Sequence, residues 1–198
     1  MKKLHLGCLD RAVPGWINTD VTPHGFVARV PFAARLLRLA GLMSEARYQQ
    51  HREGLFRDLV YLDMRRKFPF SDQTFDFVFS AHALEHLTPA HAQHCVREVY
   101  RVLRPGGLFR LSVPDLDRAV REFDPQEPEK LVELFFVPDQ RRSKNQHHWM
   151  YNAVSMERLL RSAGFGEVAR CEFRKGRCED LELLDNREHE SLFMEAVR

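Results

Sequence analysis

The sequence predicts an α/β domain with a mostly parallel sheet. Short apolar segments typical of buried strands alternate along the chain with segments whose apolar residues recur at helical spacing. Turns rich in glycine or proline, such as Pro105-Gly106-Gly107, separate the two kinds of segment. Parallel neighbours in a sheet need crossover connections, which helices packed on its faces supply. No repeat or linker divides the chain, so we expect a single domain over residues 1–198.

Four strands are expected in the first half of the chain, at residues 2–6, 16–20, 55–62 and 75–80. Between the second and third of these, residues 26–50 carry apolar side chains at helical spacing with arginines among them, and we expect helix beyond Pro31. Residues 24–54 are therefore predicted to form a helical insertion or lid within the domain.

Capping residues locate the helices of the second half. Thr88 is a predicted N-cap with Pro89 at the first helical position, and Ser155 is predicted to cap a later helix that ends at Gly164. The remaining elements are expected to be strands at 108–113, 168–173 and 192–197 and helices at 116–123 and 129–136.

Composition narrows the classes of protein to consider. The chain is 44% hydrophobic and 29% charged, an ordinary globular balance, and its net charge of +2 is too small to indicate a polyanionic partner. The four cysteines form no CxxC pair and the first residues lack a secretory apolar run, so a reducing, cytoplasmic setting is expected. Residues 27–43 are the most apolar stretch, but three arginines and Pro31 argue against a membrane span and leave only peripheral membrane contact.

Residues that suit ligand binding follow the first four predicted strands, namely Gly7, Asp20, Asp63 and Ser80. In open α/β sheets, ligands bind outside the carboxyl ends of the strands, where the strand order reverses. An aspartate after the second strand can accept hydrogen bonds from both hydroxyls of a ribose, and one after the third can accept a bond from the amine of adenine. The glycine turn allows close approach of the backbone.

Several segments resemble class I S-adenosylmethionine-dependent methyltransferases, in particular small members of the methyltransferase type 11 kind. The matching segments are LHLGC at 4–8, GWINTD at 15–20, FPFSDQTFDFVFSAHALEHL at 68–87, EVYRVLRPGGLFRLSVPDL at 98–116, HHWMY at 147–151 and LLRSAGF at 159–165. The resemblance implies a Rossmann-like, doubly wound sheet of seven strands, mostly parallel, with an antiparallel last strand. It also implies S-adenosylmethionine as cofactor and methyl transfer by in-line displacement, helped by proximity and alignment.

The same resemblance implies a cofactor site. Asp20 would hold the ribose and Asp63 the adenine, with Met64 packed on the base. The expected cofactor-binding residues are Gly7, Cys8, Leu9, Asp20, Val21, Asp63, Met64, Ser80, Ala81 and His82. The chain departs from the family pattern at Leu9, where a second glycine is usual, and at His5, where a small polar or acidic residue is usual. The Leu9 side chain is expected to narrow the site or to shift the cofactor.

Histidines supply the candidate catalytic groups. Within the resemblance, His82 would face the cofactor or substrate, while Glu85 and His86 would orient the loop. The same residues match the H-x-x-E-H pattern of a zinc peptidase class, but that pattern needs a helix, and FDFVFS before it reads as a strand, so no metal is expected.

A second histidine segment follows the predicted fifth strand. His147 or Tyr151 is a candidate base or orienter for an acceptor, and the basic run at 141–144 would attract an anionic group. The competing interpretation is a solvated loop with Trp149 buried in the core.

The leading functional hypothesis is methyl transfer to a hydroxyl, amine or carboxylate of a small-molecule or glycan-like acceptor. Leu9 favours a first alternative, a non-catalytic binding or partner protein that keeps the fold. An RNA methyltransferase is a weaker alternative, because the near-neutral chain has no recognisable RNA-binding module. A nicotinamide dehydrogenase is weaker still, since no G-x-G-x-x-G follows the first strand.

Overall fold

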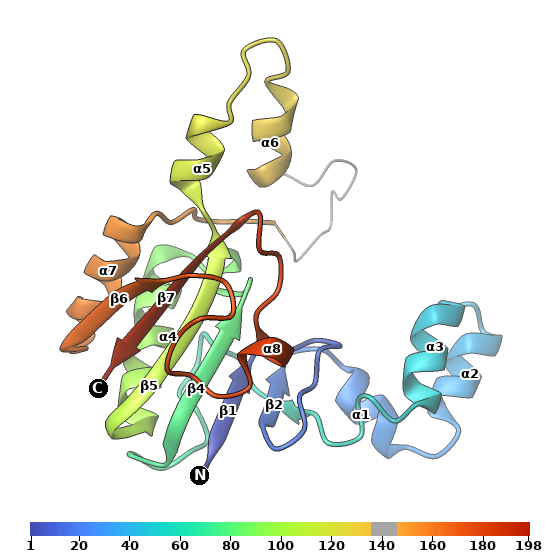
Figure 1. The fold of residues 1–198 in the computed structure, drawn as a ribbon. Helices are drawn as coiled ribbons and strands as arrows, with labels where there is room; N and C mark the ends of the chain where they lie inside the picture. Colours follow the sequence, from blue (N-terminus) through green and yellow to red (C-terminus); the bar gives the residue numbers. More distant parts are fainter. Residues whose placement is uncertain (136–145) are drawn as a thin grey trace.

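The computed structural model describes residues 1–135 and 146–198 and contains a seven-stranded sheet in the order β3-β2-β1-β4-β5-β7-β6 (Figure 1). Strand β7 pairs antiparallel with both of its neighbours, and the other pairs are parallel. The predicted mostly parallel, doubly wound sheet with an antiparallel last strand is therefore confirmed. The strands are β1 (Lys3–Leu6), β2 (Ile17–Asp20), β3 (Val60–Tyr61), β4 (Phe75–Ala81), β5 (Leu103–Pro114), β6 (Glu167–Cys171) and β7 (Ser191–Val197).

The strand order reverses beside β1. The chain runs outward from β1 to β2 and β3, then returns to place β4 on the other side of β1. In the registers, Leu6 lies opposite both Thr19 of β2 and Ser80 of β4. The residues that follow these three positions therefore emerge at one edge of the sheet, where open α/β folds bind ligands.

One face of the sheet is covered by two amphipathic helices, α4 (Pro89–Val102) and α7 (Ala153–Ser162) (Figure 1). Their apolar sides pack against every second residue of the strands, since side chains alternate between the two faces of a sheet. The main core lies between these helices and the sheet. Its members include Leu4, Val78, Val96, Phe109 and Met156.

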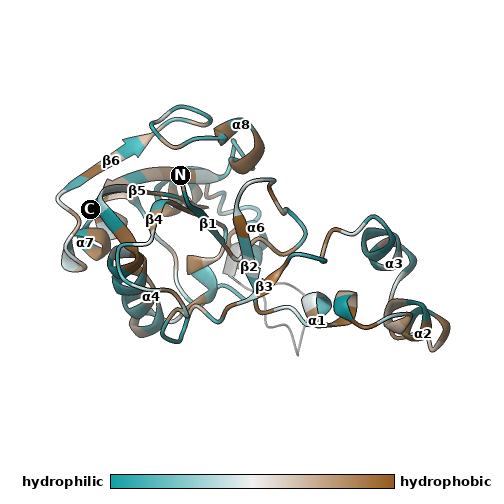
Figure 2. Ribbon diagram, turned by 90° about the horizontal axis from the view of Figure 1, so that it is seen from below, coloured by the Kyte–Doolittle hydropathy of each residue, from teal (hydrophilic) through white to brown (hydrophobic). Residues whose placement is uncertain are grey.

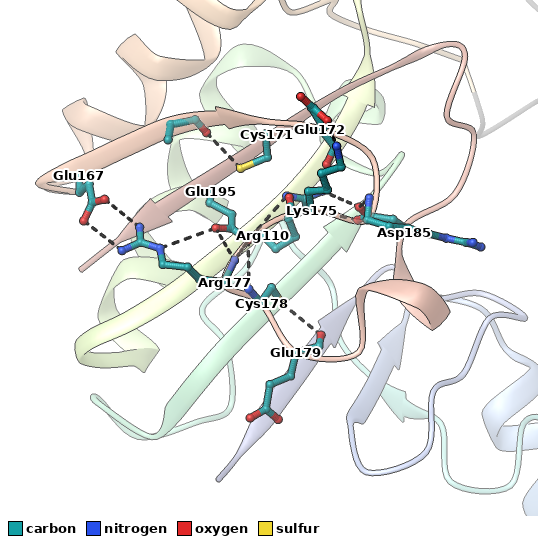
Figure 3. A network of polar contacts seen from close by, with 12 residues as sticks. Arg110, Glu167, Cys171, Glu172, Lys175, Arg177, Cys178, Glu179, Asp185 and Glu195 are labelled. Carbon is teal, nitrogen blue, oxygen red and sulfur yellow. Dashed lines mark hydrogen bonds and ion pairs between the residues drawn. The ribbon is translucent and has the colours of Figure 1, made fainter.

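The opposite face is covered mainly by loops and the short helix α8 (Leu181–Leu184). Trp16 and Phe79 pack there beside Leu184. Beneath the same segment, Arg110 of β5 is fully buried and binds the Asp185 carboxylate and the carbonyl oxygens of Glu172 and Lys175 (Figure 3). These contacts hold the loop between β6 and β7 against the sheet.

Capping confirms one predicted helix start and corrects another. The Thr88 hydroxyl accepts a hydrogen bond from the His91 N–H, with Pro89 as the first helical residue, as predicted. The prediction that Ser155 is an N-cap is wrong. Asn152 caps α7, and Ser155 is the third helical residue of a capping box in which each side chain accepts the other's backbone N–H.

The third strand is shorter than predicted. Residues 55–62 were expected to be extended, but only Val60–Tyr61 joins the sheet. Phe56 is buried outside the sheet, where it packs against the rings of His24 and His51. Its burial in this small cluster, rather than in a strand, accounts for the apolar pattern.

Residues 24–54 contain the helices α1 (His24–Arg29), α2 (Ala33–Leu39) and α3 (Glu45–Arg52), which project from the β3 side of the sheet (Figures 1 and 2). Apolar side chains lie exposed along and beside α2, namely Phe32, Leu36, Leu39 and Leu42. Within the described ranges, no helix combines the length and the apolar character needed to cross a bilayer. A role as a lid stays a prediction.

Three further helical elements lie near the carboxyl edge of the central strands. The 3-10 helix η1 (Leu84–His86) follows β4, and α5 (Leu116–Arg121) and α6 (Glu129–Phe135) follow β5 (Figure 1). Position 136, the end of the predicted helix at 129–136, lies outside the described residues.

Candidate cofactor and acceptor site

The turn after β1 brings three strand ends together at Gly7. Its φ of +67° is left-handed, and a Cβ placed on it would stand 3.0 Å from the Ala83 Cβ and 3.7 Å from the Met64 Cε. Ala83 follows β4 and Met64 follows β3, so glycine permits both the backbone angle and the close approach.

Asp20, at the end of β2, is bound to the backbone through both carboxylate oxygens. Oδ2 accepts the Leu9 N–H at 3.0 Å, and Oδ1 accepts the Thr22 N–H at 2.7 Å. A carboxylate offers about four lone-pair positions, so each oxygen keeps acceptor capacity for one more donor. That is the arrangement required by two neighbouring hydroxyl groups.

Leu9 adopts a left-handed backbone conformation, which favours glycine. Its φ is +46°, a conformation that costs a residue with a Cβ roughly 1–2 kcal/mol. The hydrogen bond from its N–H to Asp20 holds it there, and its side chain is 42% exposed. The predicted narrowing of the site by this side chain stays a prediction.

His5, the second departure from the family pattern, is a buried strand residue. Its Nδ1 lies 3.2 Å from the Asn18 Oδ1, and its ring packs edge-on against Phe79. Burial lowers the pKa of His5 to about 4, so the ring is neutral at physiological pH. It contributes to the contact between β1 and β2.

Cys8 and Val21 flank the same edge with opposite exposures. Cys8 is 3% exposed, and burial raises the pKa of its thiol to about 12, with the Asp20 charge adding to the effect. The thiol is therefore protonated at neutral pH. Val21 is exposed.

Asp63, after β3, is paired with a residue that the sequence analysis did not single out. Arg65 donates its backbone N–H and its Nε–H to Oδ1 and an Nη2–H to Oδ2. These hydrogen bonds are the main reason that the pKa of Asp63 falls to about 2. Oδ2 accepts fewer hydrogen bonds than Oδ1 and retains capacity for a donor such as an adenine amine.

Polar side chains lie at the end of β4 and just after it. Ser80 is 1% exposed, and its hydroxyl has no hydrogen-bond partner among residues 1–135 and 146–198. His82 has a left-handed φ of +48°, and its Nε2 lies 2.8 Å from the Ser191 hydroxyl. Its Nδ1 lies 3.3 Å from the Glu85 Oε1, within ion-pair distance but not aligned as a hydrogen bond. Ala81, the last residue of β4, continues the edge.

The structure places His147, one of the two later catalytic candidates, beside η1. The N–H groups of His148 and Trp149 donate to the Glu85 carbonyl, at 2.7 and 3.2 Å. The ring of His147 packs against that of His86, with centroids 5.0 Å apart. Residues 82–86 and 147–149 therefore form one cluster, whereas the basic run at 141–144 lies outside the described residues.

The competing interpretation of this segment was a solvated loop with Trp149 buried in the core. The structure shows the reverse, with Tyr151 buried and Trp149 exposed. Trp149 is 49% exposed, so its expected burial is wrong, and Tyr151 is 4% exposed. Burial, with the charge of Glu85 adding to it, raises the pKa of Tyr151 to about 12. The phenol is therefore protonated at neutral pH and can donate a hydrogen bond.

A cavity of about 260 Å³ opens beyond the end of β5, between α5, α6 and the start of β7. Its lining mixes both signs of charge with apolar surface and includes Asp115, Arg118, Lys130, Phe123, Met150 and Glu190. The sequence analysis placed an acceptor region after the fifth strand but did not name these residues. Asp115 directly follows β5, a position that could have indicated it.

The zinc peptidase interpretation fails on local geometry. It requires His82 and His86 one turn apart on an α-helix, but His82 has a left-handed backbone and Leu84–His86 is a single 3-10 turn.

The chain is similar to known methyltransferases over part of its length. Residues 33–111 match the family model described as a methyltransferase domain. A 43-residue stretch, 22% of this chain and 20% of the relative, is 46% identical to an uncharacterised methyltransferase of Synechocystis sp.. The chain therefore spans about a fifth of that curated relative's length.

Solved structures share the fold across the whole chain at low identity. An S-adenosylmethionine-dependent methyltransferase from Archaeoglobus fulgidus matches 100% of this chain and 86% of its own length, with 16% identity and a TM-score of 0.54. PigF, solved with S-adenosylhomocysteine, matches 100% of this chain and 50% of its own length, with 14% identity and a TM-score of 0.53.

The match to a methyltransferase domain lies in residues 33–111, and the strand order over the whole chain is shared with solved S-adenosylmethionine-dependent methyltransferases. The chain has the class I methyltransferase fold, and the resemblance drawn from its sequence motifs is confirmed.

Proposed function

We propose that this chain binds S-adenosylmethionine at the carboxyl ends of β1–β4 and transfers its methyl group to a hydroxyl, amine or carboxylate of a small-molecule or glycan-like acceptor. The observation that carries the proposal is the Asp20 carboxylate. Both of its oxygens are fixed by backbone N–H groups, and both retain acceptor capacity for the two hydroxyls of a ribose.

The other residues of this edge fit the remaining parts of the cofactor. Asp63 retains an acceptor position for the adenine amine, and Met64 lies within reach of the Gly7 turn. The methionine part would lie along Gly7, Cys8 and Ser80–His82, where the Ser80 hydroxyl has no hydrogen-bond partner among the described residues and can bind a polar group. When bound, the cofactor supplies a sulfonium-activated methyl group, whose carbon–sulfur bond breaks as the acceptor lone pair attacks.

The side chains on the acceptor side would hold and orient the acceptor. His82 is fixed between Ser191 and Glu85, and the protonated Tyr151 phenol is a hydrogen-bond donor. His147, half-buried beside His86, is the residue we propose as base or orienter. The mixed charges of the cavity after β5 favour a small polar acceptor over a polyanion such as RNA.

Binding of S-adenosylhomocysteine, measured by isothermal titration calorimetry, tests the cofactor site. We expect binding to the unaltered chain and a loss of at least about tenfold in affinity for Asp20→Ala, since charge-assisted hydrogen bonds each contribute about 1.5–3 kcal/mol. Asp58→Asn is the control, because Asp58 is exposed and precedes β3 rather than following it. Equal affinity of Asp20→Ala and the unaltered chain would refute the proposed ribose contact.

Leu9 supports a second candidate function, that of a non-catalytic binding or partner protein. A side chain stands where the family keeps a glycine, on a backbone held at positive φ. Absence of S-adenosylhomocysteine binding at high micromolar ligand would favour this candidate over the enzyme.

The segment around α2 supports peripheral contact with an anionic lipid surface. Phe32, Leu36, Leu39 and Leu42 are each at least 64% exposed, and residues 24–54 hold five arginines against two glutamates. Apolar side chains next to basic ones are the combination that binds such surfaces.

A further inference from the structure

We propose that Glu85, His86 and His147 form a binding site for a divalent transition-metal ion, of which Zn²⁺ is the best-fitting probe. One potential ligand atom from each of the three side chains lies within 4.8 Å of the other two. The inference does not depend on the proposed cofactor. An ion bound here would take the His147 lone pair, so His147 would then serve as an orienter and not as a base.

The Glu85 carboxylate is the first observation that points to an ion. Glu85 is 1% exposed, and neither of its oxygens has a hydrogen-bond partner among the described residues. The His82 Nδ1 lies 3.3 Å from Oε1 without forming a hydrogen bond, and Oε2 likewise has no hydrogen-bond partner among the described residues. A buried carboxylate without partners is costly, and such groups in proteins are paired or coordinate a metal.

The histidines provide the second observation. The His86 Nδ1 lies 3.1 Å from the Gln146 carbonyl oxygen, a distance at which it donates its proton and leaves Nε2 as the nitrogen with the free lone pair. A hydrogen bond from one ring nitrogen to a carbonyl is the usual outer contact of a metal-binding histidine, because it fixes the tautomer and the ring orientation.

The backbone holds the two parts of the cluster together. His86 and His147 are 61 positions apart, but the N–H groups of His148 and Trp149 both donate to the Glu85 carbonyl. The ligand-bearing segments are therefore fixed to one another before any ion binds. Such preorganisation reduces the entropic cost of assembling a metal site.

The donor set and spacing suit zinc. Two imidazoles and one carboxylate are a known set of three protein ligands for Zn²⁺, with a fourth position left open. Ligands at about 2.0–2.2 Å from a tetrahedral ion stand roughly 3.3–3.5 Å apart, so small side-chain rotations would close the present spacing. Both histidines are only half-buried, which leaves the ion a path from solvent.

This proposed site differs from the zinc peptidase site that the H-x-x-E-H pattern would form. There, His82 and His86 would be ligands and the glutamate would act on water. Here the glutamate is itself a ligand, the second histidine comes from a distant segment, and His82 lies beside the carboxylate as a neighbour.

Equilibrium dialysis of the tag-free chain against Zn²⁺ alone tests the site. We expect one ion per chain for the unaltered protein and for His148→Ala, the control, because His148 is exposed and contributes only its backbone to the cluster. Affinity is expected to fall at least about tenfold in Glu85→Gln and in His147→Ala, as removal of metal-site residues typically does.

Thermal unfolding provides a readout that separates binding from folding. Zn²⁺ should raise the midpoint of the unaltered chain and of His148→Ala, because an ion that binds only the folded state stabilises it. If Glu85→Gln does not fold, His147→Ala still tests the site. The proposal is overturned if the unaltered chain binds no Zn²⁺ at millimolar concentration, or if His147→Ala binds it as tightly as the unaltered chain does.

Discussion

At the scale of single residues, the candidate site consists of side chains whose acceptor capacity is only partly used. Asp20 and Asp63 stand out in the sequence because Asp20 ends one strand of the sheet and Asp63 follows another, and their roles toward a cofactor stay predictions. The pairing of Asp63 with Arg65 could not, since adjacent charges on a turn are usually solvated and give no pattern. The proposed role of Glu85 in metal binding could not be predicted, because the segment that lies beside it and binds its carbonyl oxygen comes some sixty positions later in the chain.

Gly7 offers a direct test of close packing at the cofactor edge. Gly7→Ala should weaken S-adenosylhomocysteine binding and lower the free energy of unfolding by about 1–3 kcal/mol, because it adds a contact of 3.0 Å to a positive φ. Gly15→Ala is the matched control, since Gly15 also has a positive φ, of +79°, but no atom of the described residues lies within 4 Å of the added Cβ. Equal effects of the two substitutions, on stability and on binding, would show that the close approach to Ala83 and Met64 has no role.

The Asp63–Arg65 pair predicts a defined dependence of stability on pH. The pKa of Asp63 is lowered from 3.8 to about 2, so the pair stabilises the fold above the unfolded pKa and loses its effect as pH falls through the folded one. Asp63→Asn should lower the free energy of unfolding by about 1 kcal/mol at neutral pH, because the half-exposed Arg65 is screened by solvent.

Urea denaturation at a series of pH values checks this prediction. The difference between the unaltered chain and Asp63→Asn should stay constant from neutral pH to about 4 and shrink below it, toward the folded pKa of about 2. A difference that grows as the pH falls below 4 would contradict the assignment of the pair.

At the scale of secondary-structure elements, prediction succeeded where a local signal and the tertiary environment agree. Thr88-Pro89 starts α4 as expected, because the cap and the fixed proline φ act within one turn. The third strand was predicted too long because Phe56 and Leu59 are buried in a side cluster under the helical segment, and a short apolar run does not distinguish the two environments. Asn152 and Ser155 are equally favourable N-cap residues three positions apart. The sequence pattern does not distinguish which of them caps the helix, and the structure shows that Asn152 does.

We expect the helical segment at residues 24–54 to bind vesicles that contain phosphatidylserine. Replacing Leu36 and Leu39 together by serine should weaken co-sedimentation at least about tenfold, since each buried leucine contributes about 1.5–3 kcal/mol. Val120→Ser is the control, because Val120 is a comparably exposed apolar residue on α5. Equal vesicle binding by the double variant and the control would exclude this surface as the contact.

At the scale of the whole molecule, the α/β class followed from the alternation of patterns, and the seven-stranded order with its antiparallel β7 followed from the resemblance. The loop cover of the second face was not predicted. Its centre is the fully buried Arg110, 75 positions from Asp185, and in the sequence both look like surface charges. A buried charge of this kind can be recognised only when its partner is known, and the partner of Arg110 becomes its neighbour only in the folded chain.

The central claim is that this fold carries a functional S-adenosylmethionine site at the ends of β1–β4. Native mass spectrometry of the freshly purified chain, followed by analysis of the released ligand, tests it most directly. We predict that S-adenosylmethionine or S-adenosylhomocysteine copurifies with the unaltered chain and with Asp58→Asn but not with Asp20→Ala. A ligand-free unaltered chain that also fails to take up added S-adenosylmethionine would contradict the claim.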